Sequence, residues 1–394
     1  MESSLPLPVR PDSTPTPREW AALLECASPA CDPHRLADLF RSLDWSRLLL
    51  LAEQHGVVGH LVVQMGTSGE DDVVPAEIRA TYVERHRAQI FSTLRLTAEL
   101  FHVLARFAAQ GIAALAVKGP VLAMHAYGDP TMRSYGDLDL LVRQRDILHA
   151  TECLQAANFE PTVSVTAIQA AKIPGQYLFA KPNANLIVEL HNEFTLRYFP
   201  RRLPLERLFA RSILVSVDGR DVPALSVEDE LVYICVHGAT HFWDRLGWIA
   251  DVAALIARQT NINWENVDAM AKEVGAERML HLGLYLASDL LHIHLPDAVL
   301  KDVRGDAGAT KLAERVHGWL MAADHRAPTL FQRAAFRLGM RGNGFSALAY
   351  LLRLSFSPTE DDWQSGEDIS QHNLLSAIGR PFRLARKYFR DGRS

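Results

Sequence analysis

Two aspartates near the middle of the chain, Asp137 and Asp139, are the residues whose types and spacing most directly suggest chemistry. They flank Leu138 and open an apolar run to Val142 that predicts a buried strand. Alternate side chains of a strand share one face, so both carboxylates project together from Cα atoms about 6.6 Å apart. Carboxylates ~4 Å apart repel by roughly 4 kcal/mol at an effective dielectric constant near 20, so the pair suits a core poorly. It suits Mg²⁺, which proteins hold with carboxylates and substrate phosphates; the simpler alternative is two solvated acids at the start of a strand.

A third acid, Glu189, lies on a later expected strand over residues 186–191. The period of two puts it on one face with Ile187 and His191. If this strand neighbours 138–142, Glu189 completes a three-carboxylate metal site with Asp137 and Asp139; otherwise it pairs with an arginine. His191 could contact a nucleotide or acceptor, or rest beside the sheet as a satisfied histidine.

Basic residues stand where a phosphate could bind. An expected strand over 112–117 ends in Lys118 and Gly119 and opens a short expected helix over 120–127. Glycine permits close backbone approach, a helix N-terminus favours anions, and Lys118 adds positive charge. Arg133, four residues before Asp137, is a second phosphate candidate. Alternatively, Lys118 is an exposed lysine of a turn and Arg133 forms an ion pair at the surface.

Two histidines further along, His237 and His241, are spaced as i and i+4 on an expected helix. A zinc protease pattern requires Glu after the first histidine, and Gly238 stands there instead, so no zinc site is expected. We expect the pair to line the acceptor side of the site or to pack in the core, and the same two alternatives hold for Trp243, Trp248 and Asp251.

Helical patterns flank this central region on both sides. Residues 1–18 are rich in Pro and Ser and predict a disordered lead. An N-terminal helical region is expected over 19–90, and a long helix runs from about 76 to 109, across its end. The core is expected over 91–225. It holds further strands over 176–180, 213–217 and 221–225, and a helix over 146–157. Helices are expected over 226–394, ending in a basic amphipathic tail, 380–393. The predicted class is α+β, with a small mixed sheet between N- and C-terminal helical regions.

The totals exclude several classes of protein. The 394 residues are 48% hydrophobic and 22% charged, with a net charge of −5, which is unlike a generally basic nucleic-acid binder. Four scattered cysteines suit a reducing compartment, no apolar stretch is long enough to span a membrane, and the first residues lack a signal-peptide pattern. We therefore expect a cytoplasmic protein.

The segment LAVKGPVLAMHAYGDPTMRSYGDLDLLV resembles the bacterial "uncharacterised nucleotidyltransferase" family of the polymerase-β-like nucleotidyltransferase superfamily. The flanking segments DWSRLLLLAEQHGVVGHL and VHGATHFWDRLGWIADVAAL are similar to that family's helical wings. The resemblance implies a palm-like core in which Asp137, Asp139 and Glu189 bind the metals while Lys118 and Gly119 approach the triphosphate. The chain has Lys118-Gly119 where the superfamily usually has Gly-Ser, and a longer gap before the acids.

The expected activity is metal-dependent transfer of a nucleoside monophosphate from an NTP to an acceptor, with release of pyrophosphate. The expected donor is ATP and the expected ion is Mg²⁺, with Mn²⁺ as a substitute. The acceptor is not identified by the sequence; the acidic balance favours a small molecule or a protein over RNA. Two alternatives remain: a nucleotide-binding module that has lost catalysis, and a helical interaction protein whose sheet is a scaffold.

Overall fold

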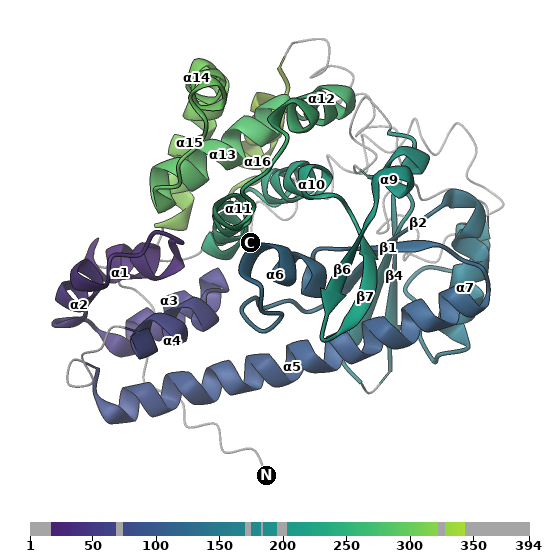
Figure 1. Ribbon diagram of the computed structural model, residues 1–394, viewed down its shortest axis with the longest axis horizontal. Coiled ribbons are helices and arrows are strands. Elements are labelled where there is room, and N and C mark those ends of the chain that lie inside the picture. Colours follow the sequence, from purple (N-terminus) through teal and green to yellow (C-terminus); the bar gives the residue numbers. More distant parts are fainter. Residues whose placement is uncertain are drawn as a thin grey trace.

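A seven-stranded mixed sheet forms the middle of the protein, with helices before and after it in the chain (Figure 1). The computed structural model describes residues 17–67, 74–169, 175–182, 184–194, 203–321 and 328–342. This arrangement confirms the α+β class and the flanking helical regions. The basic tail over 380–393 and nearly all of the expected lead lie outside the described residues.

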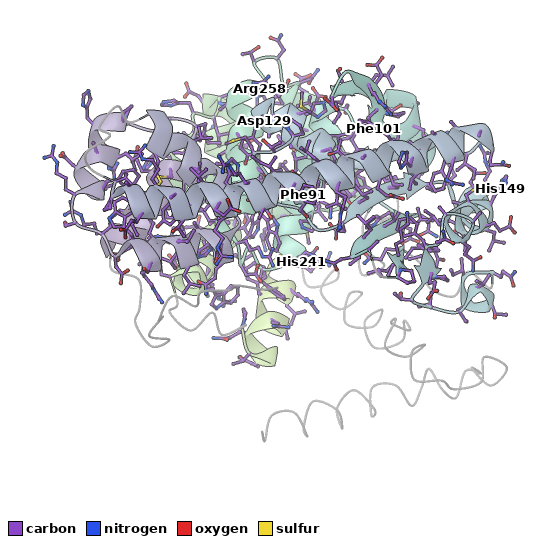
Figure 2. The ribbon with its side chains drawn as sticks, turned by 90° about the horizontal axis from the view of Figure 1, so that it is seen from below. Phe91, Phe101, Asp129, His149, His241 and Arg258 are labelled. Carbon is purple, nitrogen blue, oxygen red and sulfur yellow. The ribbon has the colours of Figure 1, made fainter. Side chains whose placement is uncertain are left out.

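Within the described residues, five helices precede the sheet. Their ends follow local signals: the Asp44 side chain accepts a hydrogen bond from Arg47 N at the start of α3, and Gly56, with φ of 70°, ends it. The long helix α5 runs past both the other N-terminal helices and the sheet, with exposed Phe91 on its outer side (Figure 2). These helices are α1 (Pro17–Ala27), α2 (Pro33–Phe40), α3 (Trp45–His55), α4 (Val58–Thr67) and α5 (Ala76–Ala109).

The strands lie in the order β3-β4-β5-β2-β1-β7-β6. The central strands are β1 (Ala114–Val117), β2 (Leu138–Val142) and β5 (Leu186–His191); the outer ones are β3 (Glu160–Pro161), β4 (Gln176–Lys181), β6 (Ile213–Val217) and β7 (Arg220–Ala224). Helix α6 (Gly119–Tyr127) connects β1 to β2. The remaining helical elements of this region are η1 (Gln144–Asp146), α7 (Ile147–Gln155), α8 (Val165–Gln169) and α9 (Leu205–Arg211).

The register of the central strands decides which side chains meet. β2 is antiparallel to β1 and parallel to β5, and Asp139 is paired with Glu189. The expected neighbour relation between these two strands is therefore confirmed. β7 joins the other side of β1 in parallel, through Ala116 and Ala224.

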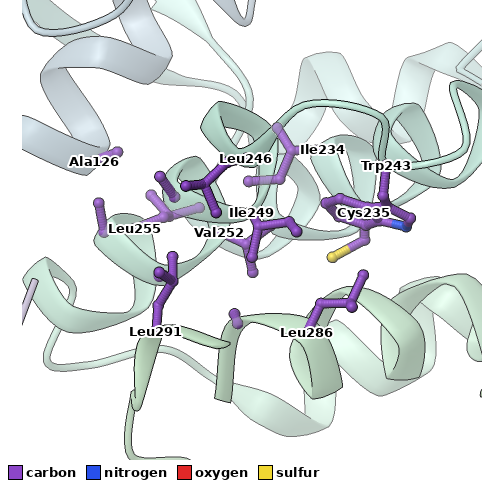
Figure 3. Close-up of a cluster of buried hydrophobic side chains, with 14 of the residues drawn as sticks. Ala126, Ile234, Cys235, Trp243, Leu246, Ile249, Val252, Leu255, Leu286 and Leu291 are labelled. Atoms are coloured by element: carbon purple, nitrogen blue, oxygen red, sulfur yellow. The ribbon is translucent and has the colours of Figure 1, made fainter. Parts of the chain in front are cut away.

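Helices dominate the described residues after the sheet. They are α10 (Val227–Thr240), α11 (Leu246–Arg258), α12 (Trp264–Val274), α13 (Glu277–Leu291), α14 (Asp297–Gly305), α15 (Ala307–Leu320) and α16 (Leu330–Gly339). Trp243 and Leu286 belong to the buried cluster between α10, α11 and α13, which reaches Ala126 of α6 (Figure 3). Within the described residues, no helix combines the length and apolar character that crossing a membrane requires.

The two faces of the sheet belong to different apolar cores. Leu138, Leu140 and Val142 pack with the second half of α5 and with α7. Leu141 and Val117, on the opposite face, pack with the N- and C-terminal helices. Since side chains alternate along a strand, Asp139 shares the face of Leu141 and is turned toward the C-terminal helices.

Several boundaries differ from those expected. The strand expected from 112 begins at Ala114, because Gly111 N and Ile112 N still donate to Ala108 O and Phe107 O at the end of α5. The boundary proposed at residue 90, between the N-terminal helices and the core, falls within α5, as it does within the helix expected over 76–109.

Candidate active site

The turn between β1 and α6 is backbone-strained at Lys118. Its φ of 56° and ψ of −146° belong to a region that side-chain-bearing residues rarely occupy, and such conformations cost on the order of 1–3 kcal/mol. The conformation places Lys118 Nζ 3.0 Å from Asp139 Oδ1, and both side chains are largely buried. Backbone strain of this kind is typical of functional sites, and here it positions the Lys118 ammonium group beside the Asp139 carboxylate.

Asp139, Glu189 and His191 meet on the face of the sheet toward the C-terminal helices. His191 Nε2 lies 2.9 Å from Asp139 Oδ1 and 3.4 Å from Glu189 Oε2. Burial raises the pKa of Asp139, but Lys118 and His191 outweigh it and hold that pKa at about 2. Burial lowers the pKa of His191, while its hydrogen bonds to the two carboxylates raise it to about 9.

Asp137 precedes β2 and lies beside these groups rather than among them. Burial, together with the charge of Asp139, raises the pKa of Asp137 to about 6, with Lys118 opposing the shift. Its carboxyl lines the same cavity as Lys118 and Glu189. Asp137 and Glu189 therefore border this cavity, while Asp139 is buried beneath it in contact with Lys118 and His191.

The cavity has a volume of about 160 Å³ and lies between the sheet and helix α10. Lys118, Asp137, Glu189 and His191 line it from the sheet side. Across from them, α10 contributes a stripe of side chains at helical spacing, and the chain after β5 adds an aromatic ring; these are Tyr233, His237, Thr240, His241 and Phe194.

The rings of His237 and His241 lie 4.6 Å apart, and both contact Trp248 on α11, at 5.2 and 5.4 Å between ring centroids. Burial and the charge of Lys118 lower both pKa values: that of His241 is about 4, and that of His237 lies well below its usual value. Near neutral pH these imidazoles are therefore uncharged hydrogen-bonding groups.

Arg133 and Asp251 do not line the cavity. They form a buried ion pair in which Arg133 Nε lies 2.8 Å from both carboxylate oxygens, and Tyr127 OH donates to Asp251 Oδ1 at 3.0 Å. Arg133 Nη1 makes a longer contact of 3.5 Å with Gly119 O. Arg133 and Asp251 are therefore not free to bind a ligand, since their charged groups bind each other. Arg133 instead contacts the turn at Gly119.

The loop that carries Arg133 and Asp137 is also tied to the long helix α5. Tyr135 OH and Thr97 Oγ1 are 3.2 Å apart, and Gln89 Nε2 donates to Thr131 O at 3.1 Å. The segment that leads into β2 is therefore held by α5 on one side and, through the Arg133–Asp251 pair, by α11 on the other.

Sequence reasoning missed Tyr233 and Phe194 as cavity residues. Tyr233 precedes His237 by four residues, so the helical spacing that relates His237 to His241 could have found it. Phe194 lies in an irregular segment just after β5, where no helical or strand periodicity predicts which way a side chain points.

The donor set fits a divalent metal ion. One ligand atom from each of Asp139, Glu189 and His191 lies within 4.8 Å of the other two, a spacing that one ion could bridge. Lys118 and His191 are the cationic groups that now face these carboxylates, and a bound cation would take over part of that role.

Comparison with known proteins places the chain in a family. No curated protein matches it. Among solved structures, the chain is similar to the crystal structure of an antigenic nucleotidyltransferase-like protein from Paracoccidioides brasiliensis, at 15% identity and a TM-score of 0.27, over 51% of this chain and 96% of that one. Residues 41–292 match the family described as "Uncharacterised nucleotidyltransferase". Since this match covers most of the chain, the protein belongs to the uncharacterised nucleotidyltransferase family.

Proposed function

We propose that the protein transfers a nucleoside monophosphate from an NTP to an acceptor and releases pyrophosphate, in a reaction that depends on a divalent metal ion. The observation that carries this proposal is the pairing of Asp139 with Glu189 across β2 and β5, with Lys118 Nζ 3.0 Å from the Asp139 carboxylate. Membership of a nucleotidyltransferase family supports the same activity.

In this reaction an acceptor oxygen attacks the α-phosphorus of the NTP, and the bond to the pyrophosphate oxygen breaks. We assign the metal to Asp137, Asp139 and Glu189, with Mg²⁺ as the expected ion. A bound ion would neutralise charge on the phosphate oxygens and the leaving group. Lys118 and the N-terminus of α6 at Gly119 would face the triphosphate, since both favour anions.

We assign the acceptor to the side of the cavity formed by α10. Tyr233, His237 and His241 offer aromatic surface and uncharged hydrogen-bonding groups there. Such a wall fits an uncharged hydroxyl-bearing small molecule or protein side chain better than it fits an RNA backbone, which basic residues would recognise. ATP is the proposed donor. The four cysteines are free thiols, which suits the reducing cytoplasm in which we propose that the protein acts.

Thermal denaturation with each NTP, with and without Mg²⁺ or Mn²⁺, tests the donor half of the proposal. Ligands that bind the native state raise the melting temperature by mass action. We expect a metal-dependent rise with ATP in the wild type that is lost in Asp139→Asn and kept in the matched control Asp221→Asn, whose carboxylate is exposed on β7.

Pyrophosphate release tests the transfer half. The protein, ATP and metal would be incubated with small-molecule, protein and RNA fractions from cells. Release with the small-molecule or protein fraction supports the proposal, and release with RNA alone contradicts the acceptor assignment. Nucleotide binding without release in any fraction would instead identify a module that has lost catalysis, and the absence of any response would favour a scaffold.

A further inference from the structure

Three potential metal ligands converge at one point of the site, and one of them is a nitrogen. Asp139 Oδ1, Glu189 Oε2 and His191 Nε2 face one another, whereas Asp137 is not part of this close group. Asp139 is 3% exposed and His191 7% exposed, so these two side chains are shielded from bulk water, while Glu189 borders the cavity.

The strand register explains why the histidine arrives there. Asp139 is opposite Glu189, and His191 is opposite Leu141 on the same pair of parallel strands. Since Glu189 and His191 are two residues apart, their side chains emerge on the same face. The imidazole of His191 can therefore contact both carboxylates, and the same nitrogen, Nε2, lies close to each of them.

This geometry differs from that of a histidine that merely orients a ligand. An orienting histidine directs an N–H at one carboxylate from outside the coordination sphere. Here Nε2 lies near both carboxylates at once, and Lys118 Nζ approaches the same Asp139 oxygen. Two cationic groups thus compensate the carboxylates that a bound metal ion would neutralise.

We propose that Asp139, Glu189 and His191 together form a mixed nitrogen and oxygen metal site that prefers a first-row transition-metal ion, with Mn²⁺ as the test ion, over Mg²⁺. Mg²⁺ favours oxygen ligands, whereas imidazole suits Fe²⁺, Ni²⁺, Cu²⁺ and Zn²⁺; Mn²⁺, the weakest nitrogen binder of the first-row series, serves as the paramagnetic test ion. On binding, the Nε2 proton is released to solvent and the nitrogen lone pair coordinates the ion. The inference deepens the proposed function, because it concerns the same site, and it replaces Asp137 by His191 among the closest ligands.

Pulsed electron paramagnetic resonance of the Mn²⁺-loaded protein tests the proposal directly. Protein labelled with ¹⁵N-histidine would be examined with Mn²⁺ alone and with Mn²⁺ plus a non-hydrolysable ATP analogue. We expect a hyperfine coupling from one histidine nitrogen in the wild type, lost in His191→Asn. His241→Asn is the matched control, because it removes a histidine of the same cavity that lies outside the three-ligand group, and it should retain the coupling.

Competition between ions supplies the second readout. We expect Mg²⁺ to displace Mn²⁺ from the wild type only at a large excess. The dissociation constant of Mg²⁺ divided by that of Mn²⁺ should be about tenfold or more lower in His191→Asn than in the wild type. Should the variant fail to fold, the labelled wild-type spectrum still decides.

Absence of a nitrogen coupling under both conditions, its persistence in His191→Asn, or its loss in His241→Asn would each overturn the proposal. These measurements involve no acceptor and no turnover. NMP transfer by a protein whose Mn²⁺ has oxygen ligands alone would therefore refute this inference and leave the proposed function standing.

Discussion

Arg133 and Asp251 are 118 positions apart in the chain and form a buried ion pair with two 2.8 Å contacts from one guanidinium nitrogen. The pair joins the loop before the catalytic candidates to α11 of the C-terminal helices. Arg133 also contacts the carbonyl of Gly119, so the same guanidinium borders the turn that carries Lys118. The C-terminal helices therefore help to hold the sheet side of the site as well as forming its opposite wall.

Breaking this pair should be strongly destabilising. Arg133→Met leaves Asp251 buried without its cation, and Asp251→Leu does the converse; each should lower the free energy of unfolding by about 3–5 kcal/mol. The double variant should lose much less than the two single losses combined, because neither charge is then left unpaired. Urea denaturation of the three variants measures this coupling.

The exposed pair of Arg41 and Asp38 provides the control, since Arg41→Met should change stability far less. Additive losses at Arg133 and Asp251 would mean that the two residues stabilise the fold independently.

The strained backbone of Lys118 leads to a second prediction. Glycine normally destabilises a folded segment relative to alanine, but at φ of 56° the order should reverse. We expect Lys118→Gly to be more stable to urea than Lys118→Ala by about 1 kcal/mol, while both lose the ammonium group and NTP binding. Equal stabilities, or a more stable alanine variant, would show that the turn relaxes at no cost.

Buried His60 should make the protein sensitive to acid. Neither of its ring nitrogens has a hydrogen-bond partner among the described residues, and burial, aided by the charge of Arg133, lowers its pKa to about 4. The unfolded chain, with a histidine pKa of about 6.5, binds more protons below that pH. His60 therefore contributes stability above pH 6.5 that is lost as the pH falls toward 4, on the order of 3 kcal/mol because one pKa unit corresponds to about 1.4 kcal/mol.

Free energies of unfolding measured between pH 7.5 and 4 would check this. His60→Leu should show a shallower decline than the wild type across that window. His149→Leu, at an exposed position of α7 (Figure 2), should follow the wild type. If the free energies of unfolding of His60→Leu and the wild type fell in parallel with pH, the His60 imidazole would take up its proton in the folded state as readily as in the unfolded chain.

The sequence predicts the parts of the fold that depend on local pattern. The long helix over 76–109 and the strand over 186–191 have the expected bounds, because an apolar stripe marks the helix and a short apolar run with a period of two marks the strand. The two-residue strand β3 and the helices α8 and α9 were not predicted; β3 exists through its pairing with β4 and has no pattern of its own.

The candidate site divides in the same way. Asp139, Glu189 and His191 could be placed on one face from the period of two, given that their strands are neighbours. The ion pair between Arg133 and Asp251 could not, because no local pattern relates a loop residue to a helix so far along the chain. Hence Arg133 was expected near a phosphate, and its buried partner was expected at the acceptor.

The final prediction concerns the close packing behind the histidine stripe of α10. A Cβ atom added at Gly238 would lie 2.5–2.6 Å from ring atoms of the fully buried Trp243, whose backbone N donates to Gly238 O at 2.8 Å. Because that hydrogen bond anchors the Trp243 backbone and the indole is fully buried, the ring has little freedom to withdraw. We expect Gly238→Ala to lower the free energy of unfolding by about 1–3 kcal/mol through overpacking.

Gly318→Ala is the matched control, since it makes the same change in helix α15 at a position with nothing within 4 Å. There the higher helix propensity of alanine should raise stability by roughly 0.5–1 kcal/mol. Opposite signs for one substitution in two helices would separate packing from propensity. Stabilisation by both would show that Trp243 can move, and with it the turn after His241, so the α10 wall of the cavity would be more adaptable than its packing indicates.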